Sequence, residues 1–134
     1  MYQLAKGNIL EELKQEGKFH EFLLIAWGII EFRTDESILK AYCLSSQNPK
    51  ADPLMELSIG KKLAVLKNAG YLSQEDYSAV LEFKKKRNDL FHVGGLFVRG
   101  LIDKEKEEIM NLGIVAVSIM DKTDASIKMT TLVQ

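Results

Sequence analysis

Residues 84–95 read Lys84-Lys85-Lys86-Arg87-Asn88-Asp89-Leu90-Phe91-His92-Val93-Gly94-Gly95. Apolar side chains recur at helical spacing before and within this stretch, and the two glycines end the pattern. On a helical wheel, Arg87 falls about 20° from Val80, in the middle of the apolar stripe. A guanidinium is seldom buried alone, so we expect Arg87 to meet an internal acid, a partner chain or a ligand. The acids that follow the apolar part of an earlier predicted helix are candidate partners for it, namely Glu31, Asp35 and Glu36.

The same periodicity, read outward from this stretch, predicts helices over most of the chain. Glycines stand where helices should end, at Gly17 and Gly70, while Ser73 and Asp103 stand where helices should begin. The expected helices span residues 2–16, 18–45, roughly 55–69, 73–92 and roughly 104–121, with a loop at 46–54, a connection at 93–100 and an uncertain tail after about 122. The sequence therefore predicts an all-α fold, an up-and-down bundle of four to five helices in one domain over residues 1–134.

The second expected helix contains a run from Phe22 to Ile30 that is apolar on every side. Such a helix is buried in the middle of a bundle or against another subunit. The run is much shorter than the roughly 20 apolar residues that span a bilayer, so we expect no membrane segment. Trp27 lies within this run and is expected in the core or at an interface.

Composition limits the classes of function. The formal net charge of -1 provides no general attraction for nucleic acid, so any such binding must be local. A single cysteine, Cys43, excludes an internal disulfide and is expected to be a buried structural thiol. Together with the absence of a signal-peptide pattern, it predicts a cytoplasmic location.

Few residues could carry chemistry. The two histidines, His20 and His92, lie far apart in the sequence, and no His or Cys spacing is typical of zinc. No glycine loop opens a helix in the way that phosphate-binding loops do. We therefore expect neither a metal nor a cofactor. The remaining combination is Arg87 with His92, where an arginine can hold a phosphate and a histidine can move a proton.

Neighbouring side chains could support this pair. Asn88 and Asp89 stand within one helical turn of His92, where they could fix its tautomer or favour its charged form. Lys84, Lys85 and Lys86 would attract a nucleic-acid strand. Each feature also has a purely structural interpretation. A lysine run is usually a solvated face, and His92 could cap the helix C-terminus. His20 is interpreted as structural.

The string Arg87-Asn88-Asp89-Leu90-Phe91-His92, near the end of the penultimate helix of an all-helical chain, resembles the motif of the HEPN (higher eukaryotes and prokaryotes nucleotide-binding) family. The family pattern is an arginine, four to six residues and a histidine, commonly with a polar residue directly after the arginine. Asn88 occupies that polar position. The motif covers six residues, and the predicted order of helices is compatible with the family across most of the chain.

This resemblance implies a helical bundle that forms a homodimer, with two Arg/His motifs meeting at the interface. Many family members are metal-independent endoribonucleases of toxin-antitoxin, phage-defence or RNA-processing systems. By similarity, Arg87 would bind the scissile phosphate, His92 would act on the 2′-hydroxyl or the leaving oxygen, and Asn88 would support them. The substrate would be RNA, because DNA lacks the 2′-hydroxyl.

An antitoxin or a nucleotidyltransferase would be a further partner by the same resemblance. Some toxin members carry a tyrosine two residues after the histidine, which such a transferase modifies. Gly94 stands at that position here, so the resemblance does not extend to that mode of control. Two alternatives remain open from the sequence: a non-catalytic HEPN-like module that binds nucleotides or partners, and a helical subunit whose Arg87 forms a buried ion pair.

Overall fold

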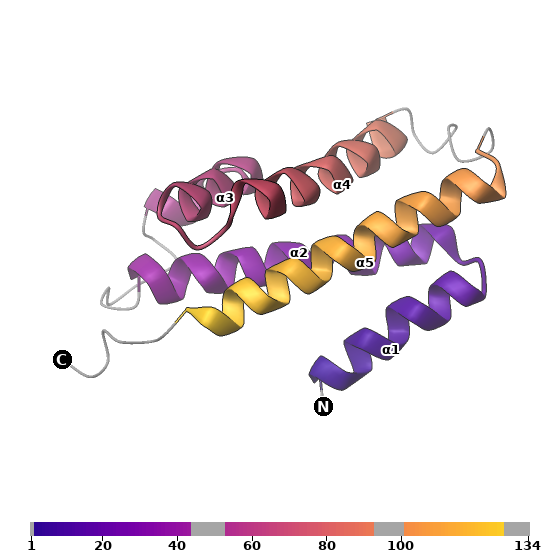
Figure 1. The fold of residues 1–134 in the computed structure, drawn as a ribbon, viewed down its shortest axis with the longest axis horizontal. Coiled ribbons are helices and arrows are strands. Elements are labelled where there is room, and N and C mark those ends of the chain that lie inside the picture. The colour runs from indigo at the N-terminus through magenta and orange to yellow at the C-terminus, as the bar shows by residue number, and fades with distance from the viewer. Residues whose placement is uncertain (1, 44–52, 93–100, 128–134) are drawn as a thin grey trace.

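The computed structural model describes the backbone of residues 2–43, 53–92 and 101–127, and the side chains of residues 9–42, 53–90 and 101–127 (Figure 1). The elements are α1 (Tyr2–Gln15), α2 (Phe19–Ile38), a π-helical extension η1 (Leu39–Cys43), a 3-10 turn η3 (Pro53–Glu56), α3 (Ile59–Asn68), α4 (Gln74–His92) and α5 (Asp103–Ser126). These ranges contain five α-helices and no strand, which confirms the predicted all-α bundle. The expected loop over 46–52, the connection over 93–100, the last seven residues and the side chain of Cys43 lie outside this description.

The helices pack around a central pair, α2 and α5, which run in the same direction, while α1 and α4 run the opposite way (Figure 1). Figure 1 shows α5 lying along α2, with α3 and α4 on one side and α1 on the other. Two predicted helix ends are confirmed, because Gly17 and Gly70 have φ angles of 70° and 90°, which a glycine adopts at little cost. The predicted cap of α4 is also confirmed, since the Ser73 hydroxyl accepts a 3.1 Å hydrogen bond from the Asp76 N–H.

Three predicted boundaries differ from the structure. The expected helix at 55–69 divides into η3 and α3, because the Ser58 hydroxyl accepts from the Lys61 N–H at 3.3 Å and starts a new helix there. The last helix is capped at Ile102 rather than Asp103. The N–H of Ile102, the residue before the helix, donates to the Glu105 carboxylate at 3.1 Å. That helix also continues beyond Asp121 to Ser126, so the first part of the uncertain tail is helical.

The three longest helices meet at a glycine. A Cβ atom added to Gly113 of α5 would lie 2.7 Å from Phe22 Cε1 and 2.9 Å from Phe83 Cε1. Both phenylalanine side chains are fully buried, one from α2 and one from α4. The missing side chain therefore allows two aromatic rings to pack on the α5 backbone, in the centre of the core.

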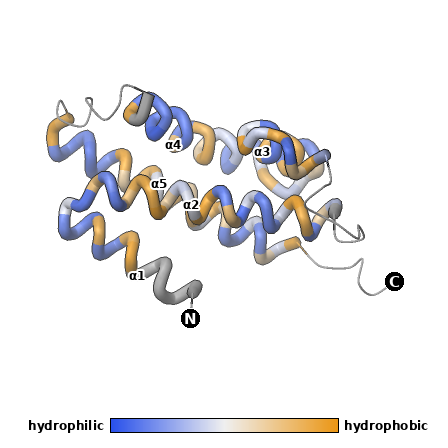
Figure 2. The backbone as a smooth tube through the Cα atoms, turned by 180° about the vertical axis from the view of Figure 1, so that it is seen from behind, coloured by the Kyte–Doolittle hydropathy of each residue, from blue (hydrophilic) through white to orange (hydrophobic). Residues whose placement is uncertain are grey.

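Helix α2 is not buried all round within this chain, so its apolar run does not lie in the middle of the bundle. Burial of its open side against another subunit stays a prediction. One side carries the core residues Phe22, Leu23, Ala26, Trp27, Ile29 and Ile30. The opposite side leaves Leu24 57% and Phe32 49% exposed, with Ile25 and Gly28 exposed between them. We call these four residues the α2 face. Seen from behind in Figure 2, apolar residues continue along this central helix.

A buried ionic cluster joins α2 to the C-terminal half of α5. The Arg33 side chain is only 6% exposed, and its Nε and Nη1 atoms donate to Asp121 at 3.0 Å and to Asp124 at 3.1 Å. Its Nη1 also donates to Glu36 at 2.9 Å. Lys40 lies 3.0 Å from the second oxygen of Asp124. The buried arginine of the described chain is therefore Arg33, whereas the sequence pointed to Arg87.

Among the described residues, no helix has the length and apolar character needed to cross a membrane.

Candidate functional site

Helix α4 carries the residues of the candidate site, and its packing decides where they point. Val80 and Phe83 are fully buried and Leu90 is 6% exposed, so one side of the helix is held in the core. On the helical wheel Arg87 lies between Val80 and Phe83, on that buried side. Its side chain is half-buried, at the boundary between α4 and α2.

The Arg87 guanidinium lies over an aromatic ring. Its central carbon is 5.1 Å from the centroid of the Trp27 ring, a cation–π contact between α4 and α2. Its Nη1 donates a 3.2 Å hydrogen bond to the side-chain oxygen of Asn88. Trp27 itself is 6% exposed and its ring centroid lies 6.4 Å from that of Phe83. Trp27 is thus a core residue, as expected, and its ring contacts the Arg87 guanidinium.

The acids expected beside Arg87 are engaged elsewhere. Asp35 accepts a 2.7 Å hydrogen bond from Lys62, and Glu36 is bound by Arg33. Glu31 is exposed on the outer side of α2. A wheel for one helix cannot tell which acids of another helix face it, so this pairing needed the tertiary structure.

The three lysines do not form one surface. The Lys84 side chain extends toward α3, where its Cε atom lies 3.8 Å from a Cβ added to Gly60. Lys85 is exposed to solvent, and Lys86 lines a pocket between α4 and α5. Consecutive helical positions are separated by about 100°, so neighbouring residues diverge. A strand bound at Arg87 would therefore meet these lysines singly rather than as a cluster.

His92 is the last residue of α4, so the structure places its backbone on the same helix as Arg87 and Asn88. Five residues along a helix correspond to a rise of about 7.5 Å. The side chain of His92 lies outside the description, and its approach to Arg87 stays a prediction. The other histidine, His20, is exposed at the start of α2, with its ring centroid 6.4 Å from that of Phe19.

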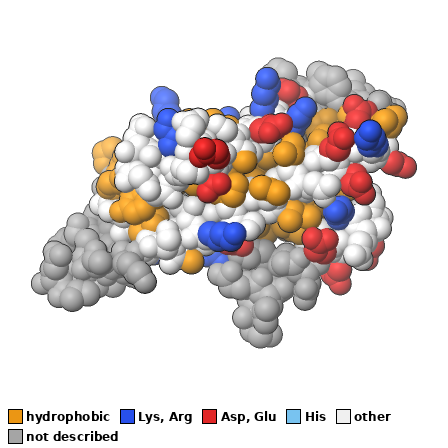
Figure 3. Space-filling model, in the orientation of Figure 1, with side chains coloured by type: hydrophobic (Ala, Val, Ile, Leu, Met, Phe, Trp, Pro, Cys, Tyr) orange, Lys and Arg blue, Asp and Glu red, His pale blue; other side chains and the backbone are white. Residues whose placement is uncertain are grey.

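A pocket of about 550 Å³ lies between α4 and the first half of α5. It is lined by Glu82, Lys86, Asp89, Leu90, Leu101, Glu105, Glu108, Ile109, Asn111, Leu112 and Val115. Sequence reasoning missed it. The structure itself marks the pocket by apolar side chains that remain exposed, such as Val115, which is 49% exposed. The sequence shows that these residues are apolar but not that they are exposed. In Figure 3, exposed apolar side chains lie between charged ones over α4 and α5.

In the part of the chain that the structure describes, no group of three or more His, Cys, Asp or Glu residues could hold a metal ion. Comparisons with models of known families, with curated proteins and with solved structures found no match. The assignment of function therefore depends on the residues and geometry described above.

Proposed function

We propose that this protein is a metal-independent endoribonuclease of the HEPN type that acts as a homodimer on RNA. The observation that carries the proposal is the position of Arg87. Its guanidinium is half-buried, oriented by Trp27 and Asn88, and lies on the same helix as His92. An arginine held in this way can offer paired N–H donors to a phosphate with little loss of side-chain entropy.

The chemistry needs no metal. Arg87 would bind the scissile phosphate and stabilise the charge that grows on its oxygens. His92 would transfer a proton from the attacking 2′-hydroxyl or to the leaving 5′-oxygen. The 2′-oxygen bonds to phosphorus as the bond to the 5′-oxygen breaks, which leaves a 2′,3′-cyclic phosphate and a free 5′-hydroxyl. Asn88 would keep the guanidinium in its orientation.

The α2 face supports the dimer. Leu24 and Phe32 lie one turn on either side of Gly28, so an antiparallel copy of α2 could place each leucine against the other copy's phenylalanine. A Cβ added to Gly28 would meet nothing within 4 Å in this chain, so packing within the monomer does not require a glycine there. A glycine allows close approach of a second helix. Trp27, whose ring contacts Arg87, stands three residues after Leu24 on α2, so this pairing would bring two copies of the motif toward the edge of one interface.

The test is cleavage of a defined single-stranded RNA in EDTA by the wild-type chain, Arg87→Ala and His92→Ala. Each variant is expected to lose at least about a hundredfold in rate, as is usual for loss of a general acid–base or an oxyanion-binding group. Lys122→Ala changes an exposed cation on α5, outside the motif and its three lysines, and is the matched control. The same strand with a 2′-deoxyribose at the cleavage site should stay intact.

Cleavage by Arg87→Ala and His92→Ala at the wild-type rate would refute the proposal, because the activity would then belong to other residues or to a contaminant. The dimer has its own measurement. Leu24→Glu and Phe32→Glu should shift sedimentation to the monomer, whereas Ile102→Glu should not. Ile102 is 61% exposed on α5 and serves as an equally accessible control. Sedimentation of both α2 variants as dimers would exclude the α2 face.

A non-catalytic HEPN-like module is the second candidate, and the Trp27 contact favours it. Arg87 already has a structural role through its contact with the core residue Trp27, so its position can be explained without a catalytic function. A wild-type dimer that leaves all RNAs intact, yet binds a nucleotide or a protein partner such as an antitoxin, would support this second function.

A further inference from the structure

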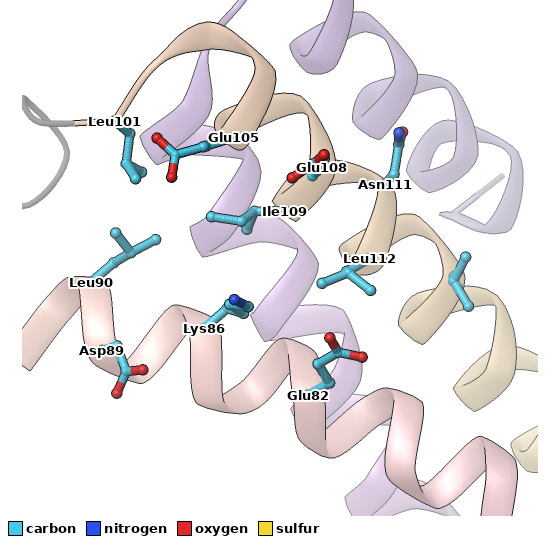
Figure 4. Close-up of a pocket in the computed structure, with 11 residues that line it drawn as sticks. Glu82, Lys86, Asp89, Leu90, Leu101, Glu105, Glu108, Ile109, Asn111 and Leu112 are labelled. Carbon is cyan, nitrogen blue, oxygen red and sulfur yellow. The ribbon is translucent and has the colours of Figure 1, made fainter.

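The pocket between α4 and α5 has the size and lining of a small-molecule site. Its volume of about 550 Å³ falls within the range of about 300–1,000 Å³ that is typical of ligand pockets. Five apolar residues form much of the lining, namely Leu90, Leu101, Ile109, Leu112 and Val115. Figure 4 shows Leu90 and Ile109 extending toward each other from the two helices, with Leu112 beside them.

The polar lining is strongly unequal in charge. Glu82, Asp89, Glu105 and Glu108 contribute four carboxylates, against the single ammonium of Lys86. None of these four carboxylates forms an ion pair with another described residue. In Figure 4, Glu82 of α4 points toward the gap between the helices, and Glu105 and Glu108 stand along its α5 side. Carboxylates at the edge of an apolar hollow attract cations and repel anions.

We propose that this pocket binds a small organic cation, with its apolar body on Leu90, Ile109 and Leu112 and its protonated amine among Glu82, Glu105 and Glu108. Burial of the ligand's apolar body supplies most of the affinity, and the carboxylates make the pocket select a positively charged ligand. Arg87 and Asn88 are not among the lining residues. Lys86 and Asp89 belong to both the lining and the motif, but the proposed contacts of the cation use neither of them, so this proposal does not depend on the ribonuclease function.

The test titrates the full ¹⁵N-labelled chain with 4-phenylbutylamine, 4-phenylbutan-1-ol and 4-phenylbutanoate while amide NMR shifts are followed. The amine is expected to shift amides of α4 and α5 around the lining residues and to bind at least about tenfold more tightly than the alcohol. The carboxylate should not bind. Added salt should weaken binding of the amine and leave that of the alcohol unchanged, because only the former depends on charge.

The double variant Glu82→Gln/Glu108→Gln is expected to lower affinity for the amine about tenfold and to leave affinity for the alcohol unchanged. Glu31→Gln/Glu75→Gln removes two exposed carboxylates elsewhere and is the control of equal charge. Leu112→Trp, with folding checked by circular dichroism, should reduce binding of both ligands by filling the hollow. Since Glu82 and Glu108 are exposed, their amide variants are expected to fold.

Equal binding of the amine and the alcohol, shifts confined to other parts of the chain, or no binding of the amine in the millimolar range would each overturn the proposal. Loss of affinity for the amine in the control double variant to the same degree would also overturn it, because the effect would then reflect net charge alone. RNA cleavage is measured separately, so failure of this site would leave the proposed ribonuclease function unaffected.

Discussion

The Arg87 guanidinium lies 5.1 Å from the centre of the Trp27 ring, and this contact joins the candidate site on α4 to the core of α2. One residue thus takes part both in the fold and in the proposed chemistry. Loss of activity in an Arg87 variant must therefore be separated from loss of stability.

Arg87→Ala is expected to lower the free energy of unfolding by about 1 kcal/mol, the usual worth of a partly desolvated cation–π contact. Arg87→Lys should lose less, because it keeps a positive charge that can reach the ring. Urea unfolding followed by Trp27 fluorescence measures both variants. Lys85→Ala, at an exposed position, should stay within about 0.5 kcal/mol of wild type. An Arg87→Ala variant as stable as Lys85→Ala would mean that the contact adds nothing to the fold.

Gly113→Ala is expected to destabilise the fold by about 1–3 kcal/mol, the usual cost of overpacking a core. The added methyl group would lie 2.7 Å from a Phe22 ring atom, and two buried aromatic rings would have to move. Gly28→Ala is the matched control on an exposed helix position. It should raise stability by about 1 kcal/mol in the monomer, since alanine is the better helix former. Thermal unfolding at a concentration that keeps the chain monomeric compares the two, and equal effects would contradict this account of the core.

Asp124→Asn is expected to cost about 1.5–3 kcal/mol at neutral pH, because it removes one of the counter-charges of the buried Arg33, which keeps Asp121 and Glu36. Burial alone would raise the pKa of Asp124, but hydrogen bonds with Glu36 and Lys40 and the charges of Lys40 and Arg33 hold that pKa below its ordinary value of 3.8. The stability that Asp124 contributes is therefore present above pH 3.8 and is lost as the pH falls through the lower folded-state pKa. Denaturant unfolding from neutral pH down to acid should show the gap between wild type and variant closing only in acid. A gap that is constant with pH would contradict the ionic role.

Glu36→Gln is expected to change stability with pH in the opposite direction. A hydrogen bond with Asp124 is the main cause that raises the pKa of Glu36 above 4.5, followed by burial and the Asp124 charge, while Arg33 lowers it. The contribution of Glu36 is thus fully present below pH 4.5 and is lost as the pH rises through the folded-state pKa. The glutamine variant has no such loss, so its stability relative to wild type should increase from acid to neutral pH. The gain should be small, because the Glu36 side chain is 37% exposed and solvent screens its interactions. A relative stability that falls over the same pH range would contradict this assignment.

Signals within a few residues determined the fold class. Apolar spacing predicted the helices, and Gly17, Gly70 and Ser73 marked ends that the structure confirms, because glycine turns and serine caps act on the backbone beside them. The same local order placed Arg87, Asn88 and His92 on one helix. The cap at Ser58 is not evident in the sequence, because apolar residues continue on both sides of it and predict an uninterrupted helix.

The tertiary structure decided everything that depends on one helix facing another. Which arginine is buried depends on Asp121 and Asp124 of α5 standing opposite Arg33 of α2, more than 80 residues away in the chain. Three other features also depend on how helices pack against one another. They are the exposure of the α2 face, the divergence of the lysines on α4 and the pocket between α4 and α5. The sequence by itself determined where helices form, because that is a local property of the backbone. Packing between distant segments decided which of their sides are buried, which are paired and which remain open to a ligand or a second chain.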